Sequence, residues 1–256
     1  VVESLEKAAR ELGVSFHYKS PVRKITTSGK MAAGIELEDG TEVPSGIVVA
    51  NADLPYVYRE LLRDKFYTAC LDKMRYSCSA ISFHWALDKT YPGLGVHNVF
   101  MSEHYKNNLD QIFRDKKVSD DPSFYVFCPR ETDPGSAPEG GDTISVIVPV
   151  GHLHKKNKGQ WEAIRDQVRI RVLERLEQQG LKDLDRHIKF EKCLMPETWE
   201  KKFHISKGSV FGSISHFILQ MGYFRPHNRH RTFRNLYFAG GSTHPGNGVP
   251  LVLMSA

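Results

Sequence analysis

A glycine-rich segment near the end of the chain carries the residues best suited to chemistry. This segment, Asn235–Pro250, holds a short apolar stretch, Leu236–Ala239, then four glycines, and Pro250 at the start of a predicted helix. Glycines let the backbone approach a ligand closely, and a helix N-terminus offers unpaired N–H groups with a partial positive charge. The pattern favours a site for a pyrophosphate group or the edge of a flavin ring. An ordinary tight turn between a strand and a helix is the alternative.

The same segment does not contain a complete dinucleotide-binding motif. Gly246-Asn-Gly248-Val-Pro-Leu251 matches only half of G-x-G-x-x-G, because Leu stands at the third glycine position, and no full match occurs elsewhere. Any primary phosphate loop is therefore expected before Val1. Both ends of the chain fall within predicted helices, so we expect the chain to be a fragment of a longer protein.

Other side chains that could do chemistry lack the partners that they would need. His152-x-His154 and His227-x-x-His230 have no nearby pair of Cys, Asp or Glu with suitable spacing, so no metal is expected. Gly212-Ser213-Ile-Ser-His lacks the G-x-S-x-G elbow of a hydrolase. The four cysteines include no C-x-x-C pair and are predicted to be reduced, mostly buried thiols.

The surrounding sequence alternates between strand-like and helix-like patterns, which predicts an α/β fold. A helix is predicted at the start of the chain, and strands over 14–18, 21–26 and 31–37, with a hairpin turn at Asp39-Gly40. Ile47–Ala50 is a continuous apolar stretch, typical of a strand buried on both faces of a parallel sheet, and Asp53 can cap the next helix. A different unit follows, with strands predicted over 79–87, 123–128, 144–150 and 187–193 and an amphipathic helix over 161–179.

Basic residues cluster in one part of a chain whose net charge is +5. The stretch Lys201–Asn235 contains seven Lys or Arg and no Asp or Glu. Aromatic residues are interleaved with these charges: Phe203, Phe211, Phe217, Tyr223, Phe224 and Phe233. Two interpretations stay open, a membrane-docking surface or core aromatics beneath a solvated charged face; nucleic-acid binding is not expected. No apolar run approaches the roughly 18 residues of a membrane-spanning helix.

The glycine-rich segment resembles the C-terminal flavin signature of bacterial- and fungal-type phytoene desaturases, within the FAD-dependent carotenoid desaturase and amine oxidase superfamily. The similarity covers essentially the whole chain. The supporting segments are Asp39-Gly40 with Ile47–Asp53, Pro122–Val126, Thr132–Pro134, Ala137–Gly140, Val148–His152 and Tyr223–Pro226. Asn247 is a departure, because the family usually carries a small residue at that position.

The resemblance implies a domain organisation and a set of cofactor contacts. Residues 1–75 and 226–256 would belong to a Rossmann-like FAD-binding domain, and residues 76–225 to a mixed-sheet substrate domain. The backbone at Val22 would meet the adenine ring, and Asn51–Asp53 would lie near the domain junction. The residues implied at the FAD are Gly240, Gly241, Ser242, Thr243, His244, Pro245, Gly246, Gly248, Val249 and Pro250.

The resemblance also implies dehydrogenation of phytoene and its partly desaturated intermediates. A hydride would pass from the polyene to the oxidised flavin while a proton leaves the neighbouring carbon. The catalytic base is unknown; His244 is the one candidate, and a turn-stabilising hydrogen bond is its alternative role. A carotenoid isomerase or another FAD-dependent polyene oxidoreductase is the nearest rival function, and a non-catalytic basic membrane-docking module is a rival of another class. Because phytoene dissolves in bilayers, an intracellular protein peripherally associated with a membrane surface is expected, with either a quinone or oxygen as electron acceptor.

Overall fold

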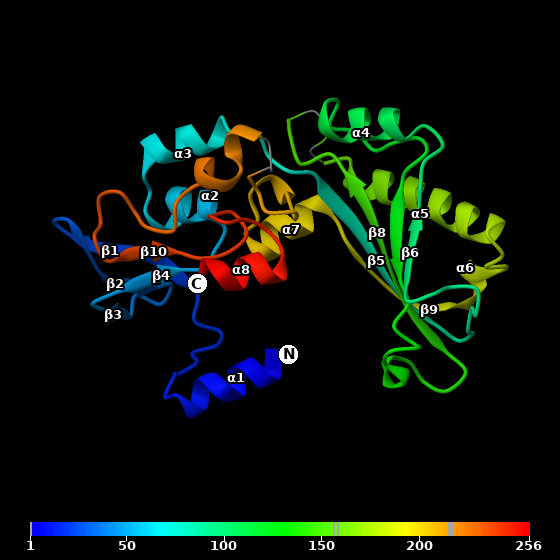
Figure 1. Cartoon of the computed structure of the whole chain (residues 1–256), viewed down its shortest axis with the longest axis horizontal. Helices are drawn as coiled ribbons and strands as arrows, with labels where there is room; N and C mark the ends of the chain where they lie inside the picture. Colours follow the sequence, from blue (N-terminus) through cyan, green and yellow to red (C-terminus); the bar gives the residue numbers. More distant parts are fainter. Residues whose placement is uncertain (1, 156, 158, 215–217) are drawn as a thin grey trace.

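Two lobes, each with its own apolar core, lie side by side in the computed structural model, which describes residues 2–155, 157, 159–214 and 218–256 (Figure 1). The core of the first lobe draws on residues between Ile25 and Leu71 and on Ile214, Leu236 and Phe238. The core of the second lobe is built between Ile81 and Met195. We call the first the glycine lobe, since it carries the glycine-rich segment, and the second the sheet lobe.

The glycine lobe contains two small sheets. Strands β1 (Val22–Ser28), β2 (Met31–Leu37) and β3 (Glu42–Pro44) form an antiparallel sheet, and the predicted hairpin turn joins β2 to β3. In that turn the Asp39 carboxylate accepts a hydrogen bond from the Thr41 N–H at 2.9 Å. Strands β4 (Val48–Ala50) and β10 (Leu236–Phe238) pair in parallel, so segments almost 190 residues apart end at the same sheet edge.

The helices of the glycine lobe are short. Helix α2 (Leu54–Tyr56) continues into the π-helix η1 (Val57–Leu61) and is followed by α3 (Lys65–Asp72); the 3-10 turns η4 (Ile218–Gln220) and η5 (Gly222–Phe224) precede β10, and α8 (Val249–Ser255) follows it. Helix α1 (Val2–Glu11) lies apart below the lobe and buries none of its residues (Figure 1).

Two predictions for this lobe are wrong. Residues 14–18 form no strand, because no other strand pairs with them, and Val14 and Tyr18 are exposed. Strand β4 is present but is not buried on both faces. Val48 and Ala50 face the core, whereas the alternating Val49 is 59% exposed on the opposite face.

The sheet lobe is built on five antiparallel strands in the order β6-β7-β8-β5-β9. Their bounds are β5 Ser79–Leu87, β6 His97–Phe100, β7 Phe124–Phe127, β8 Asp142–Val150 and β9 Ile188–Leu194, and the 3-10 turn η2 (Pro134–Ser136) precedes β8. Burial alternates along β8, with Ile144, Val146, Val148 and Val150 inaccessible to solvent. These side chains form one core with Val168, Val172 and Leu176 of α5 (Trp161–Gln178), which confirms the predicted amphipathic helix.

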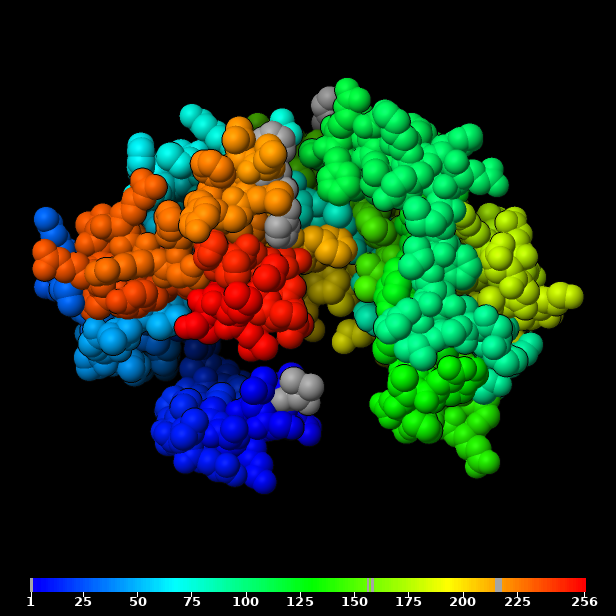
Figure 2. All heavy atoms as spheres, viewed as in Figure 1, coloured from blue at the N-terminus to red at the C-terminus, as the bar shows by residue number. Residues whose placement is uncertain are grey.

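On the other face, helix α4 (Tyr105–Phe113) lies over one end of the sheet, and α6 (Leu184–His187) precedes β9 (Figure 1). Helix α7 (Pro196–Phe203) and the 3-10 turn η3 (Ser206–Gly208) lie between the lobes, and Figure 2 shows a hollow between α8 and the sheet lobe on the face in view. Among the residues that the structure describes, no helix has the length and apolar character needed to cross a bilayer.

Candidate functional site

The glycine-rich turn begins where β4 and β10 end together. Since the two strands are parallel and in register, Asn51 and Asp53 are brought beside Gly240 and Ser242. The Asn51 side-chain amide donates to the Ala239 carbonyl at 3.1 Å, and the Ser242 hydroxyl accepts from the Leu54 N–H at 2.9 Å. The structure thus unites the two segments that the sequence singled out separately.

Three glycines in the turn adopt backbone conformations that side chains disfavour. Gly240, Gly246 and Gly248 have φ values of +121°, +142° and +119°. The turn is held by its own polar groups: the Gly240 N–H donates to Ser255 Oγ at 2.8 Å, and Thr243 Oγ1 donates to the Gly240 carbonyl at 2.9 Å. Among the atoms of the described residues, a Cβ at Gly248 would meet none within 4 Å, so the backbone leading into α8 faces open space there.

A buried arginine supports the turn from within, and sequence reasoning did not find this role. Arg225 is 1% exposed; its Nε donates to the Thr243 carbonyl at 2.9 Å and its Nη2 to the Gly241 carbonyl at 2.5 Å. Its Nη1 is buried and has no partner among the residues that the structure describes, and desolvation lowers the pKa of the guanidinium. Arg225 belongs to the segment Tyr223–Pro226, but both interpretations of the basic stretch place its charge at the surface.

Gly212 also lies against the turn, next to Arg225. Its φ is +75°, and a Cβ there would lie 2.7 Å from the Gly241 carbonyl oxygen and 2.8 Å from Asn247 Cβ. The side-chain oxygen of Asn247 also lies close to Gly241, at 3.1 Å from the position of a Cβ. Asn247 is thus packed between two glycines, which explains how the turn accommodates a side chain larger than the family's usual residue.

Asp53 ties the turn to the segment between the lobes rather than capping its own helix. Its side chain makes no capping bond to α2, although it occupies the N-cap position. Instead its carboxylate accepts a hydrogen bond from the Ser206 N–H at 3.0 Å. Burial raises the pKa of Asp53, and the Ser206 N–H opposes that shift.

The two remaining predicted positions have clear structural surroundings. His244 Nδ1 lies 3.1 Å from the Gly222 carbonyl, and its ring stacks with Tyr223, which fits the turn-stabilising alternative. Val22 begins β1, in a different sheet from the strands that lead into the turn. The base role of His244 and the adenine contact of Val22 stay predictions.

An apolar cavity of about 1350 Å³ lies between the sheet and α4. The β8 residues that alternate with the buried ones line it, together with side chains of β6, β7 and α4; representative lining residues are Val99, Leu109, Ile112, Phe124, Ile147 and Pro149. One end is polar and carries Tyr76, His152 and Lys207. Lys207 Nζ stands 3.6 Å from the centre of the Tyr76 ring, and burial lowers the pKa of His152 to about 4.

The cavity is close to the glycine-rich turn. Phe211 lines the cavity, and the next residue, Gly212, packs against Gly241. Ser77, also in the cavity wall, donates its N–H to the Ser213 carbonyl at 2.9 Å. A single segment of irregular backbone, around Phe211–Ser213, therefore separates the cavity from the turn.

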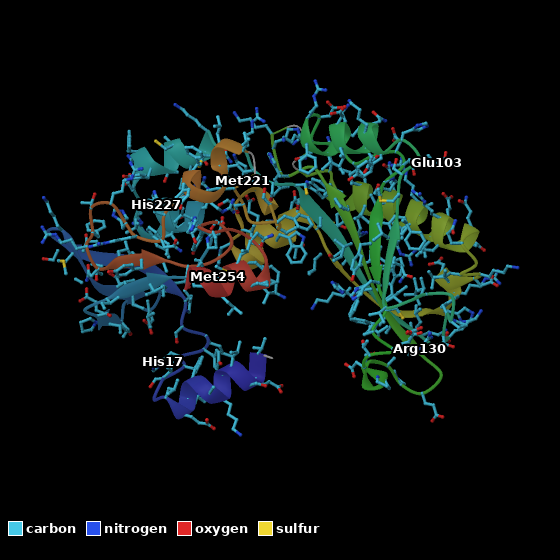
Figure 3. All side chains as sticks on the ribbon, in the orientation of Figure 1. His17, Glu103, Arg130, Met221, His227 and Met254 are labelled. Carbon is cyan, nitrogen blue, oxygen red and sulfur yellow. The ribbon has the colours of Figure 1, made fainter. Side chains whose placement is uncertain are left out.

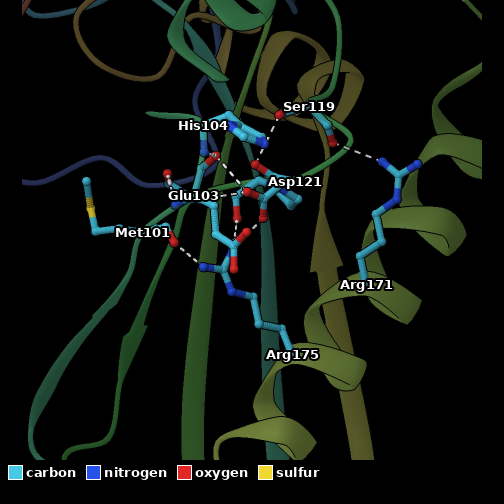
Figure 4. Close-up of polar contacts among 10 residues, drawn as sticks. Met101, Glu103, His104, Ser119, Asp121, Arg171 and Arg175 are labelled. Atoms are coloured by element: carbon cyan, nitrogen blue, oxygen red, sulfur yellow. Dashed lines mark hydrogen bonds and ion pairs between the residues drawn. The ribbon is translucent and has the colours of Figure 1, made fainter. Parts of the chain in front are cut away.

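A polar network fixes one part of the cavity wall, at Met101, to α5 (Figure 4). The Asp121 carboxylate accepts from Ser102 Oγ and the Glu103 N–H, each at 2.8 Å, and pairs with Arg175 Nη1 at 2.7 Å. Arg175 also donates to the Met101 carbonyl. Because Met101 lines the cavity, α5 positions the segment that leads into α4.

Histidines elsewhere have structural roles. Both the Thr232 and Phe233 N–H groups donate to His230 Nδ1 at 3.0 Å, so His230 closes a turn. In the described ranges, no group of three His, Cys, Asp or Glu side chains is placed to hold a metal ion. All four cysteines are free thiols, and Cys70 is exposed.

The basic stretch is split between surface and core. Arg225 is buried and Phe233 packs against the core of the glycine lobe, whereas Tyr223 and Phe224 are 90% and 66% exposed. Ile218, Leu219 and Met221 are exposed beside them, and Figure 3 places Met221 on the upper part of the lobe. Phe217 lies outside the described residues. We call Ile218, Leu219, Met221, Tyr223 and Phe224 the apolar loop.

Comparison with known proteins identifies the family. The sequence profile of the flavin containing amine oxidoreductases matches residues 1–256, and the chain belongs to this family. It is 39% identical to a phytoene desaturase of Fusarium fujikuroi, over 99% of this chain and 48% of that protein. It is 40% identical to a zeta-carotene-forming phytoene desaturase of Myxococcus xanthus, over 100% of this chain and 49% of that protein. The chain thus spans about half the length of the curated relatives it matches.

The fold agrees with that assignment. A crystal structure of an oxidoreductase from Methanosarcina mazei superposes with a TM-score of 0.58 at 18% identity, covering 99% of this chain and 52% of that one. The mixture of helices and sheets confirms the predicted α/β class.

The residues present fit the family's flavin cofactor, FAD. The open space at Gly248 lets a planar ring approach the backbone, and the exposed Val249 beside it offers an apolar contact. Arg225, which bonds to the turn, keeps a guanidinium nitrogen without a partner in the described part of the chain. Gly240–Pro250 would therefore supply one wall of a flavin site, with Val249 and the turn backbone as the groups that would hold the cofactor.

Proposed function

We propose that the protein is an FAD-dependent desaturase that removes hydrogen from phytoene and its partly desaturated intermediates. The observation that carries this proposal is the apolar cavity of about 1350 Å³, which only one segment of irregular backbone separates from the glycine-rich turn. A long hydrocarbon needs such a lining, because it offers few polar groups for recognition. The desaturase relatives support the choice of substrate class.

The chain's own residues would bind the polyene and exclude water. Side chains such as Ile112, Phe124 and Ile147 would pack along it, and the network around Asp121 would keep the wall at Met101 in place. When bound, FAD supplies an acceptor for the hydride. The apolar wall removes water from the reacting carbons, which protects a developing positive charge from attack.

Proton removal is assigned to no residue by geometry alone. His244 is a candidate, since donation from Nδ1–H to the Gly222 carbonyl would leave Nε2 with its lone pair. We expect His244→Gln to retain flavin and to slow desaturation if His244 is the base. An unchanged rate of desaturation with unchanged flavin content would show that His244 is not the base and would favour its turn-stabilising role.

The proposal is tested with the complete gene product in cells that accumulate phytoene. The visible absorption spectrum of the carotenoid extract should gain long-wavelength bands, whose positions report the number of double bonds added. Ile147→Trp, which narrows the cavity beside β8, should weaken these bands while flavin stays bound; Phe190→Trp, on the exposed face of β9, is the matched control. Unaltered phytoene with folded, flavin-loaded protein would refute desaturation.

We also propose that the apolar loop docks the protein on a membrane surface inside the cell. Five apolar side chains are exposed within seven residues, and Arg229 and Arg231 follow in the same basic stretch. Docking would let a substrate dissolved in the bilayer reach the cavity. The electron acceptor, a quinone or oxygen, stays open.

Vesicle flotation tests the docking surface. The double variant Tyr223→Ser with Phe224→Ser should lose most of its association with anionic vesicles, since two large exposed side chains no longer enter the headgroup layer. Phe190→Ser, an equally exposed aromatic position in the sheet lobe, should float like the wild type. Equal flotation of all three proteins would contradict the assignment.

A further inference from the structure

We propose that His152 is a catalytic residue, the base that takes the proton from the polyene during desaturation. The inference rests on the proposed function, which leaves proton removal without an assigned residue. His152 belongs to the polar end of the large apolar cavity, whereas His244 does not line that cavity. Of these two histidines, His152 is therefore the one that a polyene in the cavity would contact.

The hydrogen bonding of the His152 ring decides which of its nitrogens can accept a proton. Nδ1 lies 2.9 Å from the Leu153 carbonyl oxygen. A carbonyl oxygen can only accept a hydrogen bond, so Nδ1 carries the ring hydrogen and Nε2 keeps its lone pair. Nε2 has no partner in the described part of the chain, and it is not among the side-chain atoms that are closed off from solvent there. His152 therefore presents an accessible lone pair in the cavity wall.

The other titratable side chains in the cavity wall do not offer a base near neutral pH. No Asp or Glu of the described chain lines the cavity, and the lysines and arginines that do are cations. Burial raises the pKa of Cys78 to about 11 and raises the pKa of Tyr76 above its ordinary value of 10.0. These groups keep their protons at pH 7, which leaves His152 as the proton acceptor among the described lining residues.

The surroundings of His152 keep its ring neutral and ready. Its pKa falls to about 4, mainly through burial and also through the nearby charges of Lys116, Lys207 and His154, while the bond to the Leu153 carbonyl opposes the shift. At pH 7 only about one ring in a thousand is then protonated. The same neighbours favour rapid release of a proton that the ring has taken up, so the base is restored for the next turnover.

The reaction balances with His152 as the proton acceptor. At one carbon the C–H bond breaks with its electron pair, and this hydride goes to oxidised FAD. At the neighbouring carbon the C–H electron pair becomes the second bond of the new double bond, while the proton passes to His152 Nε2 and then to water. Loss of the hydride leaves positive charge on the polyene and makes the neighbouring C–H strongly acidic. A base with a pKa of about 4 is therefore sufficient.

The end of the cavity that holds His152 adjoins the glycine-rich turn. The His152 ring contacts Tyr76, with the ring centroids 6.0 Å apart, and Tyr76 forms a β-bridge with Ile214. Ile214 is two residues from Gly212, which packs against Gly241. His152 thus lies at the end of the cavity where a substrate would approach the proposed flavin wall.

The backbone around His152 is held from two other parts of the chain. A Cβ at Gly151 would lie 2.4 Å from the Lys116 carbonyl carbon, so this backbone packs directly on the segment after α4. On the other side of His152, the Leu153 N–H donates to the Lys207 carbonyl at 2.9 Å. These contacts fix the position of the ring, as general-base catalysis requires.

The first test measures the reduction of bound flavin by phytoene in the complete, flavin-loaded protein. We expect His152→Gln to slow this reduction about 100-fold or more at unchanged flavin content, because a glutamine cannot take up the proton. His227→Gln, at an exposed position outside the cavity, should react like the wild type. Equal rates for the wild type and His152→Gln would overturn the inference. Phytoene left unaltered by the wild type would instead refute desaturation itself.

Chemical rescue of His152→Ala separates a base from a packing contact. Added imidazole should raise the rate of this variant about tenfold or more, because it can occupy the vacated space and accept the proton. Pyrazole, which has nearly the same shape but is a far weaker base, should not. Rescue by both compounds alike, or by neither, would overturn the inference.

A third measurement does not depend on turnover. Diethyl pyrocarbonate modifies accessible neutral imidazoles, and mass spectrometry reports the modification of each histidine. In the flavin-loaded protein, bound phytoene should slow the modification of His152 several-fold, whereas the exposed His227 should react equally with and without phytoene. Modification of His152 at the same rate in both cases would overturn the contact between this ring and the polyene.

Discussion

Gly212→Ala tests the contact between the glycine-rich turn and the segment that separates it from the cavity. The new Cβ would stand 2.7 Å from the Gly241 carbonyl oxygen and 2.8 Å from Asn247 Cβ, where ordinary contacts are about 3.5–4.0 Å. The neighbours must therefore move by about 1 Å. Adopting the φ of +75° costs alanine about 1–2 kcal/mol, and overpacking adds about 1–3 kcal/mol.

Gly40→Ala provides the matched control. Gly40 has a φ of +88°, but a Cβ there would meet no atom within 4 Å, so only the backbone cost of about 1–2 kcal/mol applies. Unfolding in denaturant and flavin absorbance of the complete protein should show Gly212→Ala to be the less stable variant and the one that loses flavin. If both variants are equally stable and equally loaded with flavin, the packing argument fails.

Three further predictions concern titration and cofactor binding. Burial raises the pKa of Asp53, so the folded state holds this proton more tightly and loses stability as the pH rises above the ordinary value of 3.8. Asp53→Asn should reduce this pH-dependent loss of unfolding free energy. An unchanged pH dependence in the variant would contradict the prediction. Burial lowers the pKa of His152 from 6.5 to about 4, so the free energy of unfolding falls as the pH drops through this range. His152→Gln should remove this pH-dependent contribution, which is at most about 3 kcal/mol. Unfolding curves measured at a series of pH values would detect the difference. The 256-residue chain alone should bind FAD weakly or not at all, because it contains no complete G-x-G-x-x-G motif; stoichiometric flavin in the purified chain would contradict this.

The periodic spacing of apolar residues predicted the strands and helices that pack directly on an apolar core. Strand β8 and helix α5 bury alternate or helically spaced residues against each other, so the pattern in the sequence is the pattern of burial. The failure at 14–18 has the opposite cause. A strand needs a hydrogen-bonding partner, and the local alternation of residues cannot show whether one is available.

The glycine-rich turn was predictable because glycine spacing is a local signal of a special backbone. Its supports were not, because they act over distance. Arg225 donates to the Gly241 and Thr243 carbonyls from a segment that precedes the turn. Its side chain is buried, so it stabilises the turn rather than charging the surface. Similarly, Asp53 has the position of a helix cap, yet its carboxylate bonds to Ser206, more than 150 residues away.

The segment 206–214 joins the two sites and gave no signal in the sequence. Its Ser206 N–H donates to Asp53, its Gly208 carbonyl accepts from Ser79 Oγ at 2.5 Å, and its Gly212 packs on the turn. Most of these contacts are made by backbone N–H and carbonyl groups, or depend on glycine having no side chain. The residue types in the sequence therefore give little indication of them. Because one short segment contacts both the glycine-rich turn and β5 of the sheet lobe, a shift of its backbone must change the distance between the cofactor wall and the cavity. Under the proposed function, the position of the polyene relative to the flavin should therefore depend on these buried contacts as much as on the side chains that line the cavity.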